Sequence, residues 1–177
     1  MFRRSLCMLL LAQLVGCSSM SVEECQVADW YSVGLQDGQN GVPSSRINDY
    51  AQDCREANVM VDHLSWGNGY ELGLTYYCMP DNGYRVGRYG GVYNGVCDNP
   101  QFIEQYNRGI QEYRVEQRIQ EIDRELSTIA YQVQQLNKKQ NGNSEEARYL
   151  RKREKMLRSE RQALIVPTYQ YQYHFSF

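Results

Sequence analysis

The chain has 177 residues, with 19 basic and 21 acidic side chains and a net charge of −2. A chain of this length forms one hydrophobic core, or one core with an appendage, rather than several large domains. It has only two histidines, His63 and His174, as candidate bases near neutral pH. The sequence also lacks a nucleophile motif and metal-ligand spacing, so we expect neither an enzyme nor a cofactor.

Residues 1–16 have the layout of a cleaved signal peptide. Arg3 and Arg4 precede a short apolar run that ends at Leu14-Val15-Gly16-Cys17. The run of about 10 residues is about half of what a helix needs to cross a bilayer. We therefore expect export rather than a transmembrane anchor. The alternative is an ordinary signal peptide that happens to contain a cysteine.

The sequence Leu-Val-Gly-Cys resembles the lipobox of bacterial lipoproteins. In such proteins the cysteine thiol carries a diacylglyceryl group and the freed amine carries a further acyl chain. The resemblance implies that Cys17 is lipidated and tethers the chain to a membrane. Ser18, where another class of lipoproteins has Asp, favours the outer membrane of a Gram-negative cell. We expect the chain to face the periplasm, although either face of that membrane is open.

Four further cysteines remain once residues 1–16 and Cys17 are set aside. In an oxidising compartment they predict two disulfides with three possible pairings. We favour Cys25–Cys54 with Cys78–Cys97, because these pairs close the shorter loops and each contributes about 3 kcal/mol. The intervals of 29, 24 and 19 residues contain no C-x-x-C, which argues against zinc and against a thioredoxin-like function.

The composition changes near residue 103. Residues 17–103 hold the disulfide cysteines and nearly all the glycine, with 4 basic and 11 acidic side chains, whereas residues 104–166 have 13 basic and 10 acidic side chains. We expect a mainly α fold: a lipid-anchored disulfide domain at 17–103, an antiparallel helical hairpin at 104–166 and an aromatic tail at 167–177.

A weak internal repeat runs through the chain. An aromatic residue is followed by glycine three residues later and by glycine or an aromatic four after that, at Tyr31-Gly34-Gly38, Trp66-Gly69-Gly73 and Tyr106-Gly109-Tyr113. Spacings of three and four place these residues on one helical face. We expect short helices at 23–39, 45–58 and 62–78, packed through glycine and aromatic contacts. Core packing is one interpretation of the aromatic residues. The other is a stacking platform for sugars made of Trp30, Tyr31, Trp66 and Tyr70.

Residues 79–99 differ from this pattern. Pro80-Asp81-Asn82-Gly83 is typical of a turn, and the stretch after it is too rich in glycine to favour a helix. We expect a loop or hairpin-like segment. Arg85 and Arg88, with the neighbouring tyrosines, form a candidate binding patch. The alternative is a structural loop held by Cys78 and Cys97.

Three motifs in this part of the chain carry a family resemblance. They are Asp29-Trp30-x-x-x-Gly34-x-x-Asp37-Gly38-x-x-Gly41, then Tyr70-x-x-Gly73-Leu74-x-x-Tyr77-Cys78-x-Pro80 after Cys54, then Gly83-Tyr84-x-x-Gly87-Arg88-x-Gly90-x-x-Tyr93-x-Gly95-Val96-Cys97. Together they resemble an uncharacterised family of short Gram-negative lipoproteins, a domain of unknown function, over about residues 21–115. The stretch Trp66-Gly-Asn-Gly69 departs from the more charged sequence that is usual there. The resemblance implies a lipobox and a helical C-terminal continuation, and it implies no activity.

Residues 104–166 have the period of an antiparallel coiled coil. Apolar residues recur at steps of four and three along a first helix, expected at about 101–138, and a returning helix offers matching leucines about a fold near residue 141. Asn143, followed three residues later by Glu146, predicts the start of the second helix. The predicted seam is formed by Val115, Ile119, Ile122, Leu126, Ile129, Val133, Leu136, Leu150, Leu157 and Leu164.

The second helix also carries charge. Glu154 and Arg161 interrupt its seam, which indicates either a further partner surface or polar stems that reach solvent at the edge. Its basic side chains suit anionic lipid heads or a cell-wall polymer, and a solvated helix surface is the alternative. They are Arg148, Arg151, Lys152, Arg153, Lys155, Arg158 and Arg161.

After Pro167, aromatic residues alternate with polar ones, which is a strand pattern. Three interpretations are open: a strand added to the glycine-rich segment, a loose tail, and an edge strand that docks on a partner.

We therefore expect a non-enzymatic envelope adaptor or scaffold that captures a protein partner through its hairpin or tail. The alternative is a module that binds peptidoglycan or another glycan through exposed tyrosines and tryptophans. Nucleic acid is not an expected partner of a tethered envelope protein.

Overall fold

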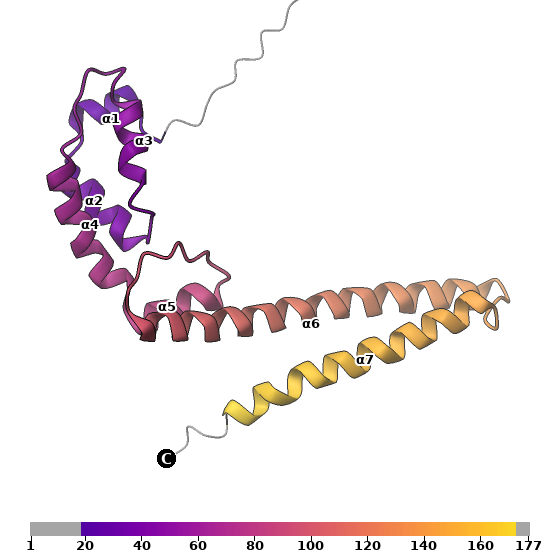
Figure 1. Cartoon of the computed structure of the whole chain (residues 1–177). Coiled ribbons are helices and arrows are strands. Elements are labelled where there is room, and N and C mark those ends of the chain that lie inside the picture. Colours follow the sequence, from indigo (N-terminus) through magenta and orange to yellow (C-terminus); the bar gives the residue numbers. More distant parts are fainter. Residues whose placement is uncertain (1–18, 173–177) are drawn as a thin grey trace, which may run out of the picture. The chain divides into compact units, whose positions relative to one another are not determined.

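The computed structural model describes residues 19–172, with side-chain surroundings up to residue 165. The described residues form seven helices and no strand, which confirms the mainly α fold class (Figure 1). The chain divides into two compact units, with the division between Tyr76 and Tyr77. We call the described residues up to 76 unit 1 and those from 77 unit 2, and describe each by itself. The helices are α1 Val22–Val27, α2 Trp30–Gln39, α3 Arg46–Asp53, α4 His63–Tyr77, α5 Pro80–Arg88, α6 Pro100–Lys138 and α7 Glu145–Gln172.

Unit 1 begins with two helices where the sequence predicts one. A single helix over 23–39 is wrong because Asp29 has extended backbone and its side chain accepts a hydrogen bond from the backbone N–H of Tyr31, which starts α2. The helix predicted at 45–58 ends earlier, at Asp53, before Asn58 with a φ of 54°. The helix predicted at 62–78 agrees with α4.

Both predicted disulfides are confirmed. Cys25 pairs with Cys54 and Cys78 pairs with Cys97, each with a Cα–Cα distance of 5.5 Å. The first disulfide lies in the core of unit 1, formed by Cys25, Trp30, Ile47, Tyr50, Cys54, Trp66 and Tyr70. The second lies in a smaller core of unit 2, formed by Tyr77, Cys97 and Phe102.

Helices α2 and α4 touch through their glycines. A Cβ atom added at Gly34 would lie 2.0 Å from the carbonyl oxygen of Trp66, and one at Gly69 would lie 2.0 Å from that of Tyr31. No side chain fits at such distances, so glycine is required at both positions. The repeated aromatic and glycine spacing is therefore the packing surface of this helix pair.

Helices α5 and α6 pack in the same way in unit 2. A Cβ atom at Gly87 would lie 2.3 Å from the carbonyl oxygen of Tyr106, and one at Gly109 would lie 2.3 Å from that of Tyr84. The prediction that residues 79–99 form a loop or hairpin is thus wrong for α5 at Pro80–Arg88, and it is right for residues 89–99. The helical cost of glycine is outweighed by the close backbone contact that glycine allows, and Pro80 suits the first turn of α5.

Three of the four glycine contacts of the α2–α4 pair, at Gly34, Gly38 and Gly73, recur at equivalent positions in the α5–α6 pair. Adding 49 to a residue number in α2 gives the equivalent residue of α5, and adding 36 to a residue number in α4 gives the equivalent residue of α6. A Cβ atom added at Gly73 would lie 2.4 Å from the carbonyl oxygen of Leu35, just as one added at Gly109 would lie 2.3 Å from the carbonyl oxygen of Tyr84. Each pair also has a disulfide that joins the segment before its first helix to the segment before its second. The described chain therefore contains the same supersecondary unit twice.

The turns that follow the first helix of each pair confirm this equivalence. The hydroxyl of Tyr70 donates to the carbonyl oxygen of Val42 at 2.7 Å. In the second pair, the hydroxyl of Tyr106 donates to the carbonyl oxygen of Gly91 at 3.1 Å. Tyr106 and Gly91 are the residues equivalent to Tyr70 and Val42. Gly41 and Gly90 precede the accepting residues, with φ of 63° and 72°. Both turns need glycine because this φ is strained for other residues.

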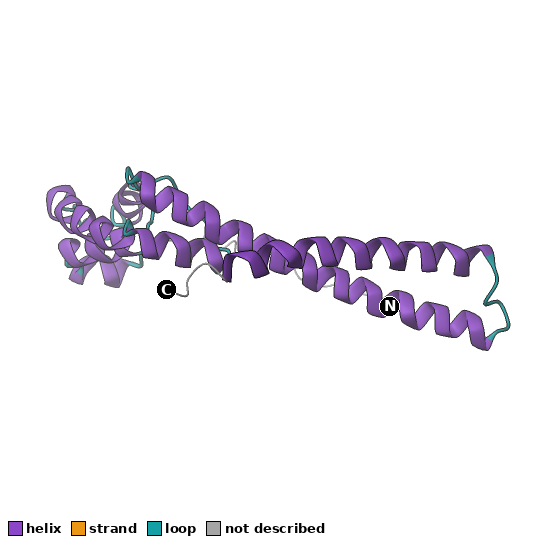
Figure 2. Ribbon diagram, turned by 90° about the horizontal axis from the view of Figure 1, so that it is seen from below, coloured by secondary structure: helices purple, strands orange, loops and turns teal. Residues whose placement is uncertain are grey.

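Helices α6 and α7 form an antiparallel hairpin (Figure 2). Its core is formed by eight of the ten predicted seam residues: Ile122, Ile129, Leu150 and Leu157 are buried, and Leu126, Val133, Leu136 and Leu164 are partly buried against them. Val115 and Ile119 are half-buried outside this cluster. The cap predicted at Asn143 is wrong by one residue, because the Ser144 hydroxyl accepts from the backbone N–H of Ala147 and α7 starts at Glu145.

The strand pattern after Pro167 does not produce a strand in the described part of the tail. Helix α7 continues to Gln172. Pro167 itself has no N–H to donate to the helix. Each residue added after it gains one backbone hydrogen bond, and this local gain overrides the alternating pattern. Residues 173–177 lie outside the described residues, as does Cys17.

Candidate functional surfaces

The aromatic platform predicted for sugars is mostly inside the core. Trp30, Trp66 and Tyr70 are all buried, and only Tyr31 is exposed. The rings of Trp66 and Tyr70 stack on each other with centroids 4.6 Å apart. Rings that pack on each other inside unit 1 cannot stack on a sugar, so their arrangement fits the core-packing interpretation instead.

A buried carboxylate, Asp37 of the first family motif, lies beside these rings. Asp37 accepts hydrogen bonds from the indole of Trp66 at 3.0 Å and from the hydroxyl of Tyr50 at 3.2 Å. Burial raises the pKa of Asp37. Burial, together with the nearby Asp37 charge, raises the pKa of Tyr50 to about 12. Asp37 thus ties α3, through Tyr50, to α2 and α4.

The second helix pair has apolar residues at the positions of Asp37 and Trp66. The offsets of 49 and 36 place Val86 at the position of Asp37 and Phe102 at that of Trp66. The α5–α6 pair therefore packs without a carboxylate and without an indole N–H. A hydrogen-bonded pair in one unit is thus matched by an apolar pair in the other.

A cleft of about 410 Å³ opens beside Asp37. Both oxygens of Asp37 already accept hydrogen bonds from protein groups, so this carboxylate is committed to the core beside the cleft. In the described part of the chain, no three His, Cys, Asp or Glu side chains are grouped as a metal site. The cleft is lined by Met20, Glu24, Val27, Ala28, Val33, Gln36, Asp37, Asn40 and Tyr50.

The arginines predicted as a binding patch are used within unit 2. Arg85 donates to the side-chain oxygen of Asn82 at 2.6 Å, one turn earlier on α5. Arg88 forms an ion pair with Glu116 at 2.6 Å and thereby joins α5 to α6. Their positions fit the structural interpretation of this segment.

Four of the seven basic residues predicted on α7 also have partners inside the hairpin. Arg153 pairs with Glu125 and Arg161 pairs with Asp123, both across the seam at 2.7 Å. The other two pairings stay within α7 and the loop before it: Arg158 with Glu154, and Arg151 with the carbonyl oxygen of Gly142. Glu154 and Arg161 therefore interrupt the seam without leaving it open, because their charged ends reach partners at its edge.

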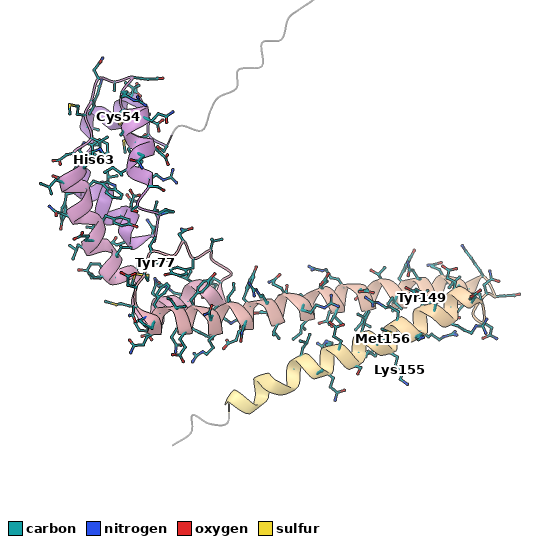
Figure 3. The ribbon with its side chains drawn as sticks, viewed as in Figure 1. Cys54, His63, Tyr77, Tyr149, Lys155 and Met156 are labelled. Carbon is teal, nitrogen blue, oxygen red and sulfur yellow. A yellow bond between two sulfur atoms is a disulfide. The ribbon has the colours of Figure 1, made fainter. Side chains whose placement is uncertain are left out.

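The other three cations lie together on α7. Arg148, Lys152 and Lys155 are exposed, and their spacing of four and three places them on one face, opposite Leu150 and Leu157. Figure 3 shows Lys155 on the side of α7 away from α6. Tyr149 and Met156, 67% and 54% exposed, lie beside them. We call these five residues the outer face of α7. The spacing of its three cations was visible in the sequence, but only the structure shows that their side chains form no ion pair with the described residues.

None of the described helices combines the length and the apolar character that a membrane span requires.

Comparison with known proteins finds one similar family, whose description names no activity. No curated protein and no solved structure matches the chain. Residues 29–111 match the family described as Protein of unknown function (DUF2799). The match begins at Asp29, the cap of α2, and ends two residues after Gly109, so it includes α2, α4, α5 and the part of α6 that packs on α5 through Gly109. Residues 29–111 are therefore similar to the DUF2799 family, in agreement with the resemblance to an uncharacterised domain.

Proposed function

We propose that the chain is a non-enzymatic adaptor of the bacterial cell envelope, tethered to a membrane by lipid on Cys17. The outer face of α7 binds a protein partner, and the surface of that partner is acidic. One observation carries the proposal. Four basic residues of α7 are used inside the hairpin, whereas Arg148, Lys152 and Lys155 point away from it.

The composition of the outer face suits a protein partner. Clustered cations speed the approach of an acidic surface and select against basic ones. Tyr149 and Met156 supply exposed apolar area, and tyrosine and methionine are both enriched in protein interfaces. The hairpin core needs none of these five side chains, because its seam is already closed by the leucines and isoleucines.

The tether rests on the first residues of the chain. Leu-Val-Gly-Cys17 is similar to a lipobox, and two disulfides agree with an oxidising compartment outside the cytoplasm. Ser18 favours the outer membrane, and the adaptor would face the periplasm. Replacing Cys17 with Ser should abolish fatty-acid labelling and release the protein from membranes. Continued labelling of the Cys17→Ser variant would contradict the tether.

Photocrosslinking in intact cells tests the partner. A photoreactive residue replaces Lys152 on the outer face of α7 or, as a matched control, the exposed Arg124 on α6. We expect a protein adduct from position 152 and none from position 124. The adduct should disappear when Arg148 and Lys155 are both changed to Glu, because these changes reverse the charge without touching the seam.

Two results would reject the adaptor. One is equal crosslinking from both positions, which would show that the outer face of α7 has no special role. The other is recovery of peptidoglycan alone, with no protein adduct, which would favour the glycan-binding alternative.

A further inference from the structure

The chain is fixed to unit 1 very close to Cys17. The backbone N–H and the hydroxyl of Ser19 donate to one carboxylate oxygen of Asp53 at 2.7 and 2.6 Å, and the backbone N–H of Met20 donates to the same oxygen at 3.2 Å. Ser19 is two residues after Cys17, and two residues span at most about 7 Å. A lipid on Cys17 would therefore hold this end of unit 1 within a short distance of the bilayer.

The disulfide of unit 1 marks the same end. The sulfur of Met20 contacts the sulfur of Cys54 at 3.8 Å, and Cys54 is bonded to Cys25. Figure 3 shows Cys54 and His63 at one end of unit 1 and Tyr77 at the far end of α4. We call the end that holds Ser19, Asp53 and the Cys25–Cys54 disulfide the anchor end.

Two of the most exposed apolar side chains of the described residues lie at the anchor end. Met60 is 91% exposed and Val27 is 82% exposed. Val59 and Val61 pack against the core on either side of Met60, and the N–H of Val59 donates to the carbonyl oxygen of Cys54. The backbone thus holds Met60 outward.

Val27 is presented in a similar way. It is two residues after the buried Cys25 and immediately before Ala28, which packs against the core. Both exposed side chains therefore project from backbone that the core and the disulfide hold in place.

We infer that the anchor end is a membrane-seating surface: Val27 and Met60 enter the interfacial region of the lipid bilayer to which Cys17 is tethered. This inference rests on the proposed lipidation of Cys17 and adds the orientation of unit 1. The short tether raises the local concentration of lipid at these two side chains, so shallow contacts suffice. Their burial is apolar and does not need anionic lipid, so salt should not reverse it.

The test uses the lipidated protein reconstituted in phosphatidylcholine vesicles. Val27→Cys and Met60→Cys variants each carry an environment-sensitive fluorophore on the new thiol. This thiol is the only reactive one, because the other four cysteines of the domain form disulfides and Cys17 is acylated. The matched control is Tyr76→Cys, a 51% exposed aromatic position on α4, 13 residues or about 20 Å along the helix from His63.

We expect a blue shift and quenching by spin-labelled lipid at positions 27 and 60, unchanged in 0.5 M salt, and no quenching at position 76. Vesicle-bound, lipidated protein with no quenching at positions 27 and 60 would overturn the seating and leave the tether intact. Equal quenching at all three positions would also overturn it. A blue shift that needs a second protein rather than vesicles would assign the anchor end to a protein interface instead. If the purified chain carries no acyl group on Cys17 and does not bind the vesicles, the tether itself is rejected.

Discussion

The indole N–H of Trp66 donates a hydrogen bond to Asp37 over 3.0 Å in the core of unit 1, and the equivalent positions of unit 2 hold Phe102 and Val86. The same helix pair is thus built once around a buried hydrogen bond and once without it. The packing of the pair requires the glycine contacts, which recur in both units, whereas the hydrogen bond is particular to unit 1.

Changing Asp37 to Val and Trp66 to Phe together, as in the second pair, should lower the free energy of unfolding by less than the sum of the two single changes. Asp37→Val leaves the donors Trp66 and Tyr50 without an acceptor, and Trp66→Phe leaves a buried carboxylate oxygen without its donor. Each should lower the free energy of unfolding by about 1–3 kcal/mol. The double variant should recover about 1 kcal/mol or more of their sum. Urea unfolding of the four proteins measures this coupling, and strict additivity would show that the two residues act independently.

Stability should also depend on the protonation of Asp37. Its pKa is raised above the ordinary value of 3.8 because burial penalises the charged form. Between 3.8 and the raised pKa the folded chain binds more protons than the unfolded chain, so the contribution of Asp37 falls as pH rises through this window. Glu24, Asp29 and Asp62, whose pKa values are lowered, act in the opposite sense. The prediction therefore concerns the difference between the wild type and Asp37→Asn, followed by urea unfolding from pH 3 to 7. The wild type should lose stability relative to the variant as pH rises, and parallel curves would contradict this.

Glycines at the helix contacts should respond differently from a glycine that faces open space. Gly109→Ala places a Cβ 2.3 Å from a backbone oxygen and should destabilise the protein by about 3 kcal/mol or more. Its equivalent, Gly73→Ala, should have a similar effect. Gly67 has nothing within 4 Å of such a Cβ and lies inside α4, so Gly67→Ala should stabilise the protein by about 0.5–1 kcal/mol. Thermal unfolding ranks the three variants, and a destabilising Gly67→Ala would contradict the packing described for α4.

Two adjacent residues of α7 test the hairpin seam. Leu157 is fully buried and Met156 is largely exposed. Truncating Leu157 to Ala should cost about 2–5 kcal/mol through lost burial and a cavity, whereas Met156→Ala should cost less than about 1 kcal/mol. Guanidinium unfolding followed by circular dichroism gives both values. Equal effects would mean that Leu157 does not pack against α6.

Removal of either disulfide should destabilise its own unit by a similar amount. The loops closed by Cys25–Cys54 and Cys78–Cys97 have sequence separations of 29 and 19. Loop-closure entropy then predicts a loss of about 3–4 kcal/mol for the first disulfide and about 3 kcal/mol for the second. Paired Cys→Ala variants, compared by urea unfolding under non-reducing conditions, check these values. No loss from the second pair would mean that the α5–α6 contact holds residues 89–99 without it.

The hairpin and the disulfide pairing were predictable from the sequence because each depends on regular spacing. Steps of three and four set the seam of Ile122, Ile129 and Leu157 without reference to other elements. The shorter loops favoured the observed cysteine pairs over the alternatives. The aromatic and glycine repeat also pointed to close helix packing.

Helix α5 was not predictable in the same way, because Gly83 and Gly87 are poor helix formers by themselves. Only the close approach of α6, which a side chain at Gly87 would block, makes a helix favourable there. The outer face of α7 also needed the tertiary structure. The sequence shows seven basic residues, but only the packed hairpin decides which of them find partners across the seam. Periodicity is local and can be read along the chain, whereas backbone contact between glycines and the pairing of charges exist only once distant segments have met.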